Sequence, residues 1–342
     1  MGLFKTINLI GITALSLGLG ACQKTENKTA TQNEQQNQNT ELNSAQSEDV
    51  QKLAIGFQKS SLNLLVTREQ KLLEQQFPNA QIEWREFPAG PQMLEALAVG
   101  AVDFGAVGNT PPIFAQSADK DLNYAAYELS PQTSLALVLP NQSPIKNIGE
   151  LKGKRIALQK GSSAHEFLAK VLQKAGLTWQ DIEPIWLPPA DARAAFDKGS
   201  VDAWAIWDPF LAAIELTGHS KVLIDGQSFP QTYSYYISNP KFTTAHPEAV
   251  NKVIQSLNAA DQWILNHQSL ALELYANSTG LNSDVAKRAI DRRLKPSPIR
   301  LPNTEIVQSQ QQIADLFFSE KLIPKQIKVQ DVVLNIAPKP SL

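Results

Sequence analysis

The sequence predicts an α/β protein with two similar lobes and a ligand cleft between them. From about residue 53 onward, short apolar strands alternate with amphipathic helices. One order of elements occurs twice: strand, polar turn, helix, strand, proline turn, helix, Gly-x-Val-Asp and strand. Because ligands of such sheets bind beyond the carboxyl ends of the strands, the two sets of turns are expected to face one cleft. A duplicated fold without a ligand is the alternative.

Length, charge and cysteine content exclude several classes. The 342 residues suffice for two ordinary domains or one large bilobal protein. A formal net charge of −2 gives no general attraction to nucleic acid. The single cysteine rules out a disulfide framework and a cysteine-based metal site, and the four histidines lack zinc-binding spacing. We therefore expect no metal, no other cofactor and no nucleic-acid partner.

The N-terminus has the pattern of an export signal followed by a tether. Lys5 precedes an apolar stretch, residues 7–19, that is too short to span a bilayer comfortably. The stretch ends in Leu19-Gly20-Ala21-Cys22, which resembles the lipobox of bacterial lipoproteins. We expect a signal peptide over residues 1–21, a lipid anchor on Cys22 and a disordered tether over 22–50, which is rich in Gln, Asn, Thr and Ser. An ordinary signal peptide with a chance cysteine is the alternative.

The first copy of the repeat begins with an apolar strand at residues 53–57. The polar turn Gln58-Lys59-Ser60-Ser61 leads into a helix that continues through Phe77. A strand at 82–87, a helix at 92–99 and a strand near 101–107 follow. After Gly108-Asn109, Thr110 is the expected N-cap of the next helix, with Pro111 at its first position.

The second copy contains the turn on which the functional prediction rests. A strand at 156–158 runs through Gly161-Ser162-Ser163 into a helix that opens at Ser162 or Ser163. Glu166 suggests a capping box with Ser163, and Gly176 ends the helix. Backbone N–H groups at such a helix start, with the helix dipole behind them, form an anion site. A helix cap without a ligand is the alternative.

The remaining chain sets the expected lobe boundaries. Residues 135–139 are the candidate crossing to the second lobe, and 232–237 the candidate return. Helical stripes from Pro247 onward, with a final helix at about 305–318, most simply complete the first lobe. We therefore predict lobe I over 51–137 and 230–342, and lobe II over 138–229.

Several long phrases resemble one protein family. They are Phe87-Pro88-Ala89-Gly90-Pro91-Gln92-Met93-Leu94-Glu95-Ala96-Leu97, Gln159-Lys160-Gly161-Ser162-Ser163-Ala164-His165, Pro189-Ala190-Asp191-Ala192-Arg193-Ala194-Ala195-Phe196, and Val201-Asp202-Ala203-Trp204-Ala205-Ile206-Trp207-Asp208-Pro209. Together they are similar to the aliphatic sulfonate-binding proteins of bacterial ABC importers, over about residues 53–329.

The resemblance implies a type II periplasmic-binding-protein fold, whose two lobes are joined by two hinge strands. It also implies capture of an alkanesulfonate by lobe closure, and delivery to an ABC permease and its ATPase for sulfur acquisition. Such a protein acts as a monomer in the periplasm, here anchored to a membrane through Cys22. Relatives on this scaffold bind taurine, nitrate or heteroaromatic metabolites, so these ligands are the alternatives. Asn109 departs from the family pattern, because close relatives often carry Asp there.

A sulfonate is a monoanion with three acceptor oxygens, so we expect a site of donors without carboxylate acceptors. This chemistry and the family motifs predict the ligand-binding residues Gln58, Ser60, Ser61, Gly90, Pro91, Gln92, Asn109, Thr110, Gly161, Ser162, Ser163, His165, Asp191, Arg193 and Trp207. Three of these have open alternatives. Arg193 could instead pair with Asp191 or Asp197 on the surface, and His165 could be a helix-surface histidine. Trp207 could belong to the core.

The sequence favours a binding protein over an enzyme. It contains no Ser-His-Asp set in a recognisable motif and no P-loop, and its only cysteine belongs to the predicted anchor. We therefore predict no catalytic residues. A tethered sensor that presents a ligand-bound face to a signalling partner is a further alternative.

Overall fold

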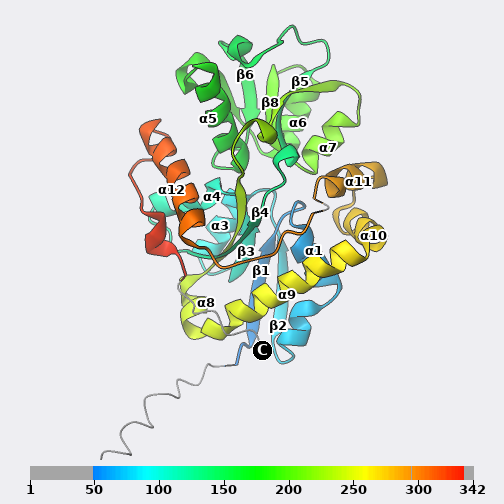
Figure 1. Ribbon diagram of the computed structural model, residues 1–342, viewed down its shortest axis with the longest axis vertical. Coiled ribbons are helices and arrows are strands. Elements are labelled where there is room, and N and C mark those ends of the chain that lie inside the picture. Colours follow the sequence, from blue (N-terminus) through cyan, green and yellow to red (C-terminus); the bar gives the residue numbers. More distant parts are fainter. Residues whose placement is uncertain (1–48, 294, 335–342) are drawn as a thin grey trace, which may run out of the picture. The chain divides into compact units, whose positions relative to one another are not determined.

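The computed structural model describes residues 49–293 and 295–334, which contain two five-stranded sheets (Figure 1). The strands of the first sheet are β1 (Lys52–Phe57), β2 (Gln81–Glu86), β3 (Phe104–Val107), β4 (Asn123–Leu129) and β10 (Tyr233–Ser238). Their order is β2-β1-β3-β10-β4. β1 pairs in parallel with β2 and β3, whereas β10 lies antiparallel between β3 and β4.

The second sheet repeats this plan. Its strands are β5 (Leu135–Pro140), β6 (Arg155–Leu158), β7 (Glu183–Trp186), β8 (Ala203–Trp207) and β9 (Ser220–Asp225). In the order β7-β6-β8-β5-β9, β5 takes the antiparallel place that β10 has in the first sheet. We name the parts built on the first and second sheets lobe I and lobe II. The predicted two-lobed type II fold is confirmed.

The two Gly-x-Val-Asp phrases have the same structural role. In lobe I the Asp103 carboxylate accepts a hydrogen bond from the backbone N–H of Ala54, at 2.8 Å. In lobe II the Asp202 carboxylate accepts one from the backbone N–H of Arg155, also at 2.8 Å. Each aspartate therefore ties the loop before one strand to the neighbouring strand, which explains why this part of the sequence repeats.

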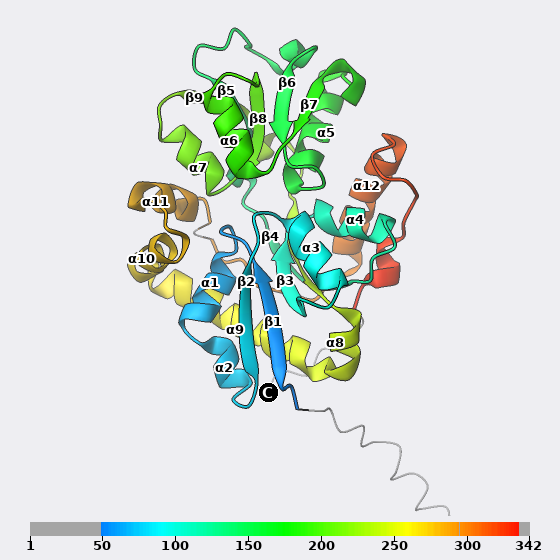
Figure 2. The same ribbon diagram turned by 180° about the vertical axis from the view of Figure 1, so that it is seen from behind.

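Helices cover both faces of each sheet (Figures 1 and 2). Lobe I contains α1 (Leu62–Glu69), α2 (Leu72–Gln76), α3 (Gly90–Ala98), α4 (Thr110–Ser117), α8 (Pro240–Ala245), α9 (Pro247–Asn266), α10 (Gln268–Thr279), α11 (Ser283–Asp291) and α12 (Thr304–Ser319). Lobe II contains α5 (Ser163–Ala175), α6 (Pro189–Asp197) and α7 (Phe210–Glu215).

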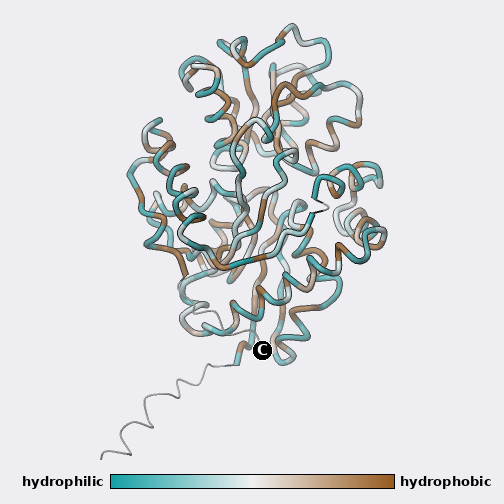
Figure 3. The backbone as a smooth tube through the Cα atoms, in the orientation of Figure 1, coloured by the Kyte–Doolittle hydropathy of each residue, from teal (hydrophilic) through white to brown (hydrophobic). Residues whose placement is uncertain are grey.

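Each sheet separates two apolar cores. On β5, Leu137 and Leu139 enter one core of lobe II, while Ala136 and Val138 enter the other. On β10, Tyr236 and Tyr235 divide in the same way between the two cores of lobe I. This alternation follows from the two-residue period of a strand and explains why β5, with a core on each face, is a continuous apolar run (Figure 3).

Three local predictions are wrong in detail. The helix expected to run through Phe77 is two helices, because Lys71 adopts a left-handed φ of 52° between α1 and α2. Asn109, not Thr110, is the N-cap of α4, so Pro111 is the second helical residue. The capping box at the start of α5 does not form, because Ser162 is the N-cap, makes no side-chain cap hydrogen bond, and donates its hydroxyl to the Gln159 carbonyl oxygen at 2.7 Å.

Other predictions concern residues that the structure does not describe or does not decide. Residues 1–48 lie outside the described residues. The signal peptide (1–21), the lipid anchor on Cys22 and most of the tether (22–50) therefore stay predictions. The predicted lobe boundary at 137/138 falls within β5, which pairs with strands of the second sheet from Leu135 to Pro140. The full extents of the lobes therefore stay a prediction. Within residues 49–293 and 295–334, no helix has the length and apolarity needed to cross a bilayer.

Candidate ligand-binding pocket

A pocket of about 150 Å³ lies between the two lobes. Its walls come from the ends of β1, β3 and β8, the starts of α4 and α5, and the two segments that connect the lobes. This volume is below the roughly 300–1,000 Å³ of pockets for drug-sized molecules, so the site suits a smaller ligand. Eight predicted site residues line it: Gln58, Ser60, Ser61, Gly90, Asn109, Ser162, Ser163 and Trp207.

The turn after β1 is held in place by its own side chains. The backbone N–H of Gln58 donates to the Ser61 hydroxyl at 3.2 Å, and the Gln58 side-chain amide donates to the Ala106 carbonyl oxygen at 2.9 Å. The Lys59 side chain instead reaches the end of α10, where its ammonium group donates to the Thr279 carbonyl oxygen at 2.7 Å. These contacts fix Ser60 and Ser61 at the pocket.

The start of α5 faces the same pocket. No side chain caps this helix, so none competes with an anion for its first backbone N–H groups, although that of His165 already donates to the Ser162 carbonyl oxygen at 2.9 Å. Lobe I approaches this point closely, because a Cβ atom added to Gly108 would lie 1.8 Å from the Ser163 hydroxyl oxygen. A larger residue at Gly108 would thus require the Ser163 hydroxyl to turn away or the lobes to move apart.

Asn109 is fixed by a helix from the other end of the chain. The Gln310 side chain on α12 donates to the Asn109 carbonyl oxygen at 2.5 Å and to the Tyr124 hydroxyl at 2.9 Å. The Asn109 side-chain oxygen accepts a hydrogen bond from the Thr110 hydroxyl at 3.0 Å. Its amide group is thus oriented, with the side chain buried at the pocket wall.

The other seven predicted residues lie outside the pocket lining. They are Pro91, Gln92, Thr110, Gly161, His165, Asp191 and Arg193. Arg193 forms an i,i+4 ion pair with Asp197 at 2.7 Å, which is one of the surface alternatives that the sequence left open. Asp191 is exposed on the same helix. The structure thus gives these residues no contact with the pocket, and their role in binding stays a prediction.

His165 is buried against aromatic rings from both lobes, so it is not a helix-surface residue. The centre of its ring lies 5.4 Å from the ring centre of Phe114 and 5.1 Å from that of Phe317, both of lobe I. The rings of Trp179 and Trp186 of lobe II are also close. The ring nitrogen Nδ1 accepts a hydrogen bond from the Gly161 backbone N–H at 3.2 Å. Burial, together with the positive charge of Lys160, lowers the pKa of His165 to about 3.

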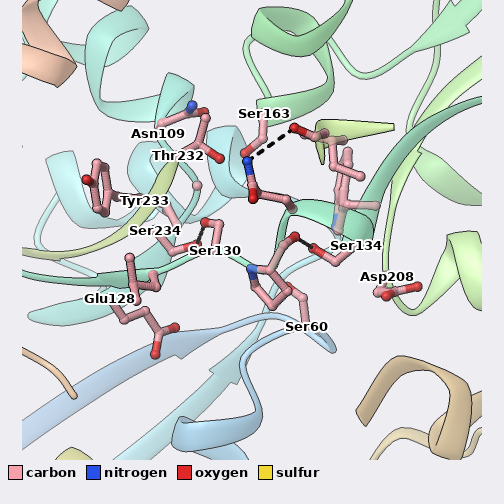
Figure 4. Close-up of a pocket in the computed structure, with 18 of the residues that line it drawn as sticks. Ser60, Asn109, Glu128, Ser130, Ser134, Ser163, Asp208, Thr232, Tyr233 and Ser234 are labelled. Carbon is pink, nitrogen blue, oxygen red and sulfur yellow. Dashed lines mark hydrogen bonds between the residues drawn. The ribbon is translucent and has the colours of Figure 1, made fainter. Parts of the chain in front are cut away.

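The pocket walls contain carboxylates, which the expected set of donors did not include. The lining includes Glu128 and Asp208, which are labelled in Figure 4, and also Glu166, Lys170 and Arg293. Each carboxylate has a cationic partner, so the acidic charges in the walls are balanced. The three pairs are Glu166–Lys170, Glu128–Arg293 at 3.1 Å and Asp208–Arg292 at 2.8 Å.

Burial dominates the protonation of two of these acids. It raises the pKa of Asp208 to about 6, against the opposing effect of Arg292. Burial also raises the pKa of Glu128, although Arg293 acts in the opposite direction. The Glu128 carboxylate in addition accepts a hydrogen bond from the Asn63 side chain at 2.8 Å. Among the described residues, no cluster of side chains could hold a metal ion.

The segments that join the lobes also contribute residues that the sequence analysis missed. Ser130 and Ser234 share a hydrogen bond of 2.8 Å between their hydroxyl oxygens (Figure 4). The Gln132 side chain donates to the Phe229 carbonyl oxygen at 2.9 Å, across the two connecting segments. Gly226 packs so tightly that an added Cβ would lie 2.3 Å from the Gln132 carbonyl oxygen. These contacts hold the two segments together beside the pocket.

The fold and the pocket define a two-lobed α/β binding protein. Residues 85–271 match the family described as NMT1/THI5 like. A protein of Escherichia coli strain K12 that is named as an aliphatic sulfonates-binding protein is 42% identical to this chain over 278 residues, which cover 81% of this chain and 87% of that protein. A second such protein, in Bacillus subtilis strain 168, is 34% identical over 299 residues, covering 86% and 89%. The chain belongs to the NMT1/THI5-like family, together with these sulfonates-binding proteins.

Solved structures agree with this assignment. The alkanesulfonate-binding protein SsuA from Xanthomonas axonopodis pv. citri, bound to MOPS, is 41% identical with a TM-score of 0.80, covering 83% of this chain and 98% of that chain. The periplasmic aliphatic sulphonate binding protein SsuA from Escherichia coli is also 41% identical, with a TM-score of 0.76 and coverages of 82% and 97%. The desulfurization enzyme DSZB, at 14% identity and a TM-score of 0.61, shares the fold alone.

Proposed function

We propose that this protein captures small aliphatic sulfonates between its lobes and delivers them to an ABC permease and its ATPase for sulfur acquisition. The observation that carries the proposal is the balance of charge in the pocket. Neutral donors and the uncapped start of α5 offer hydrogen bonds to an anion, while every lining carboxylate is already paired with a cation. Such walls suit a monoanion, because a second negative charge would find no free cation among the lining residues.

The described relatives support the cargo class. They are named for aliphatic sulfonates or alkanesulfonate, and the Xanthomonas structure contains MOPS. The resemblance to importer components supports a protein that binds without turning its ligand over.

We propose that it acts as a monomer in the periplasm, with Cys22 lipidated and the tether giving the folded part its reach. Loss of fatty-acid labelling in Cys22→Ser would test the anchor, and unchanged labelling would contradict it.

Isothermal titration tests the cargo. The panel is methanesulfonate, 1-butanesulfonate, taurine, nitrate, sulfate and phosphate, in Tris chloride, because a relative's structure holds the sulfonate buffer MOPS. We expect saturable binding of the alkanesulfonates and, at pH 8.5 where both sulfate and phosphate are dianions, much weaker binding of these two. Selective binding of taurine or nitrate would replace the cargo with one of the alternatives, and tight phosphate binding would contradict the proposal.

A further inference from the structure

Four charged side chains join the lobes at one side of the pocket. Arg292 follows α11 of lobe I and reaches across to Asp208 and Glu215 of lobe II. One guanidinium nitrogen donates to both Asp208 carboxylate oxygens, at 2.8 and 3.0 Å, and the other donates to Glu215. Arg288 on α11 donates to the same Glu215 carboxylate at 3.1 Å. We name Arg288, Arg292, Asp208 and Glu215 the interlobe ion cluster.

Three of the four side chains in the interlobe ion cluster are largely shielded from water, whereas Arg288 is 51% exposed. The side chains of Arg292, Asp208 and Glu215 are only 12%, 10% and 14% exposed. Lobe II also fixes its own half of the cluster, since Asp208 accepts a hydrogen bond from the Ala212 backbone N–H at 3.0 Å. If the lobes separate, the acids leave the arginines and all four groups are hydrated. The ion pairs therefore exist only when the lobes are together.

We propose that Arg292 is a positioning residue that holds the lobes together over the ligand and slows ligand release. The inference rests on the proposed function, because it assigns Arg292 a role in retaining that ligand. Arg292 does not itself line the pocket; it acts through Asp208, which does, and through Glu215, which does not. Removing one partner of a shielded charge pair leaves the other buried without compensation, and such losses act mainly on the dissociation rate.

Glu215→Gln separates this role from simple pocket electrostatics. The change removes a negative charge near the site and leaves the Asp208–Arg292 pair in place, so electrostatics alone would strengthen binding of an anion. The interlobe ion cluster predicts the opposite: the dissociation constant of 1-butanesulfonate rises at least about tenfold, with faster release in stopped-flow measurements. Arg292→Gln is expected to act in the same direction, and Arg292→Lys, which cannot reach both acids equally, to be intermediate.

Lys287→Gln is the matched control. Lys287 lies beside Arg288 on α11 but pairs with Asp291 of the same helix, at 2.8 Å, on the exposed side. Its replacement should leave the dissociation constant within about twofold of the wild type. Unchanged or tighter binding by Glu215→Gln, with its fold retained by circular dichroism, would overturn the inference.

Hydrogen exchange in the full chain without ligand keeps the inference testable if the cargo proposal fails. We expect peptides covering α7 and α11 to exchange faster in Glu215→Gln and Arg292→Gln than in the wild type, and at the wild-type rate in Lys287→Gln. If wild-type protein binds no sulfonate but these exchange differences appear, the cargo is wrong and the interlobe role stands. If exchange is identical in all four proteins, the interlobe role is wrong.

Discussion

His165 is buried between aromatic rings of both lobes, and this burial makes the fold sensitive to acid. The unfolded chain takes up a proton on this side chain near its ordinary pKa of 6.5, whereas the folded chain does so only near a pKa of about 3. Because the unfolded state binds the proton more readily, the free energy of unfolding falls as the pH drops from 6.5 towards 3. Above pH 6.5 the contribution is constant.

The size of the effect follows from the two pKa values. Between pH 8 and pH 5, linkage gives a loss of about 2 kcal/mol from this one group. Other groups titrate in the same range: burial raises the pKa of Asp208 to about 6, which acts in the opposite direction. The measured quantity is therefore the difference between the wild type and His165→Asn. Asparagine can still accept the hydrogen bond of the Gly161 backbone N–H that His165 Nδ1 now accepts.

Urea unfolding at pH 8 and pH 5, in buffers without a sulfonate group, provides the assay. Loss of the ring contacts should make His165→Asn less stable than the wild type at pH 8. The wild type should then lose about 2 kcal/mol more than the variant on going to pH 5. His219→Asn, at an exposed position, should behave as the wild type does. Equal losses in the wild type and His165→Asn would refute the argument from burial.

Three further predictions concern the pocket, each measured by isothermal titration. Gly108→Ala should weaken methanesulfonate binding without lowering stability to urea, because the new Cβ would meet the Ser163 hydroxyl only when the lobes are together. Unchanged affinity would show that the lobes meet differently. Trp207→Ala should weaken the binding of 1-pentanesulfonate by about tenfold and that of methanesulfonate much less, since the change removes apolar wall area. Equal losses for the two ligands would place the alkyl chain elsewhere. Asn109→Asp should raise the ratio of taurine affinity to methanesulfonate affinity, because the new carboxylate repels the sulfonate of both ligands but attracts the ammonium group of taurine. An unchanged ratio would contradict this.

Sequence patterns predicted the fold well because its signals are local and occur twice. The Gly-x-Val-Asp phrases put Asp103 and Asp202 in equivalent places, and each binds a backbone N–H of the neighbouring strand. The turns at Ser60 and Ser163 reach the pocket because short segments attach them to buried strands. Local signals misled only in detail, as at Lys71, where one left-handed residue divides the expected helix.

Two of the three charged pairs at the pocket were missed because their members are distant in the sequence; the third, Glu166–Lys170, is an i,i+4 pair on α5. Arg292 is 84 residues from Asp208, and Arg293 is 165 residues from Glu128. No spacing rule relates such positions, whereas the pair of Arg193 with Asp197 follows the i,i+4 rule. His165 shows the same limit, since the rings of Phe114 and Phe317 that help to bury it belong to the other lobe.

The central claim is that the pocket selects a monoanion, and one matched pair of ligands tests it most directly. Propanesulfonate and propylphosphonate have the same alkyl chain and a tetrahedral head group, but at pH 9 the phosphonate carries a second negative charge. We would titrate both into the full chain in Tris chloride at pH 9. The charge-balanced walls predict that propanesulfonate binds at least about a hundredfold more tightly. Equal or tighter binding of the phosphonate would contradict the account.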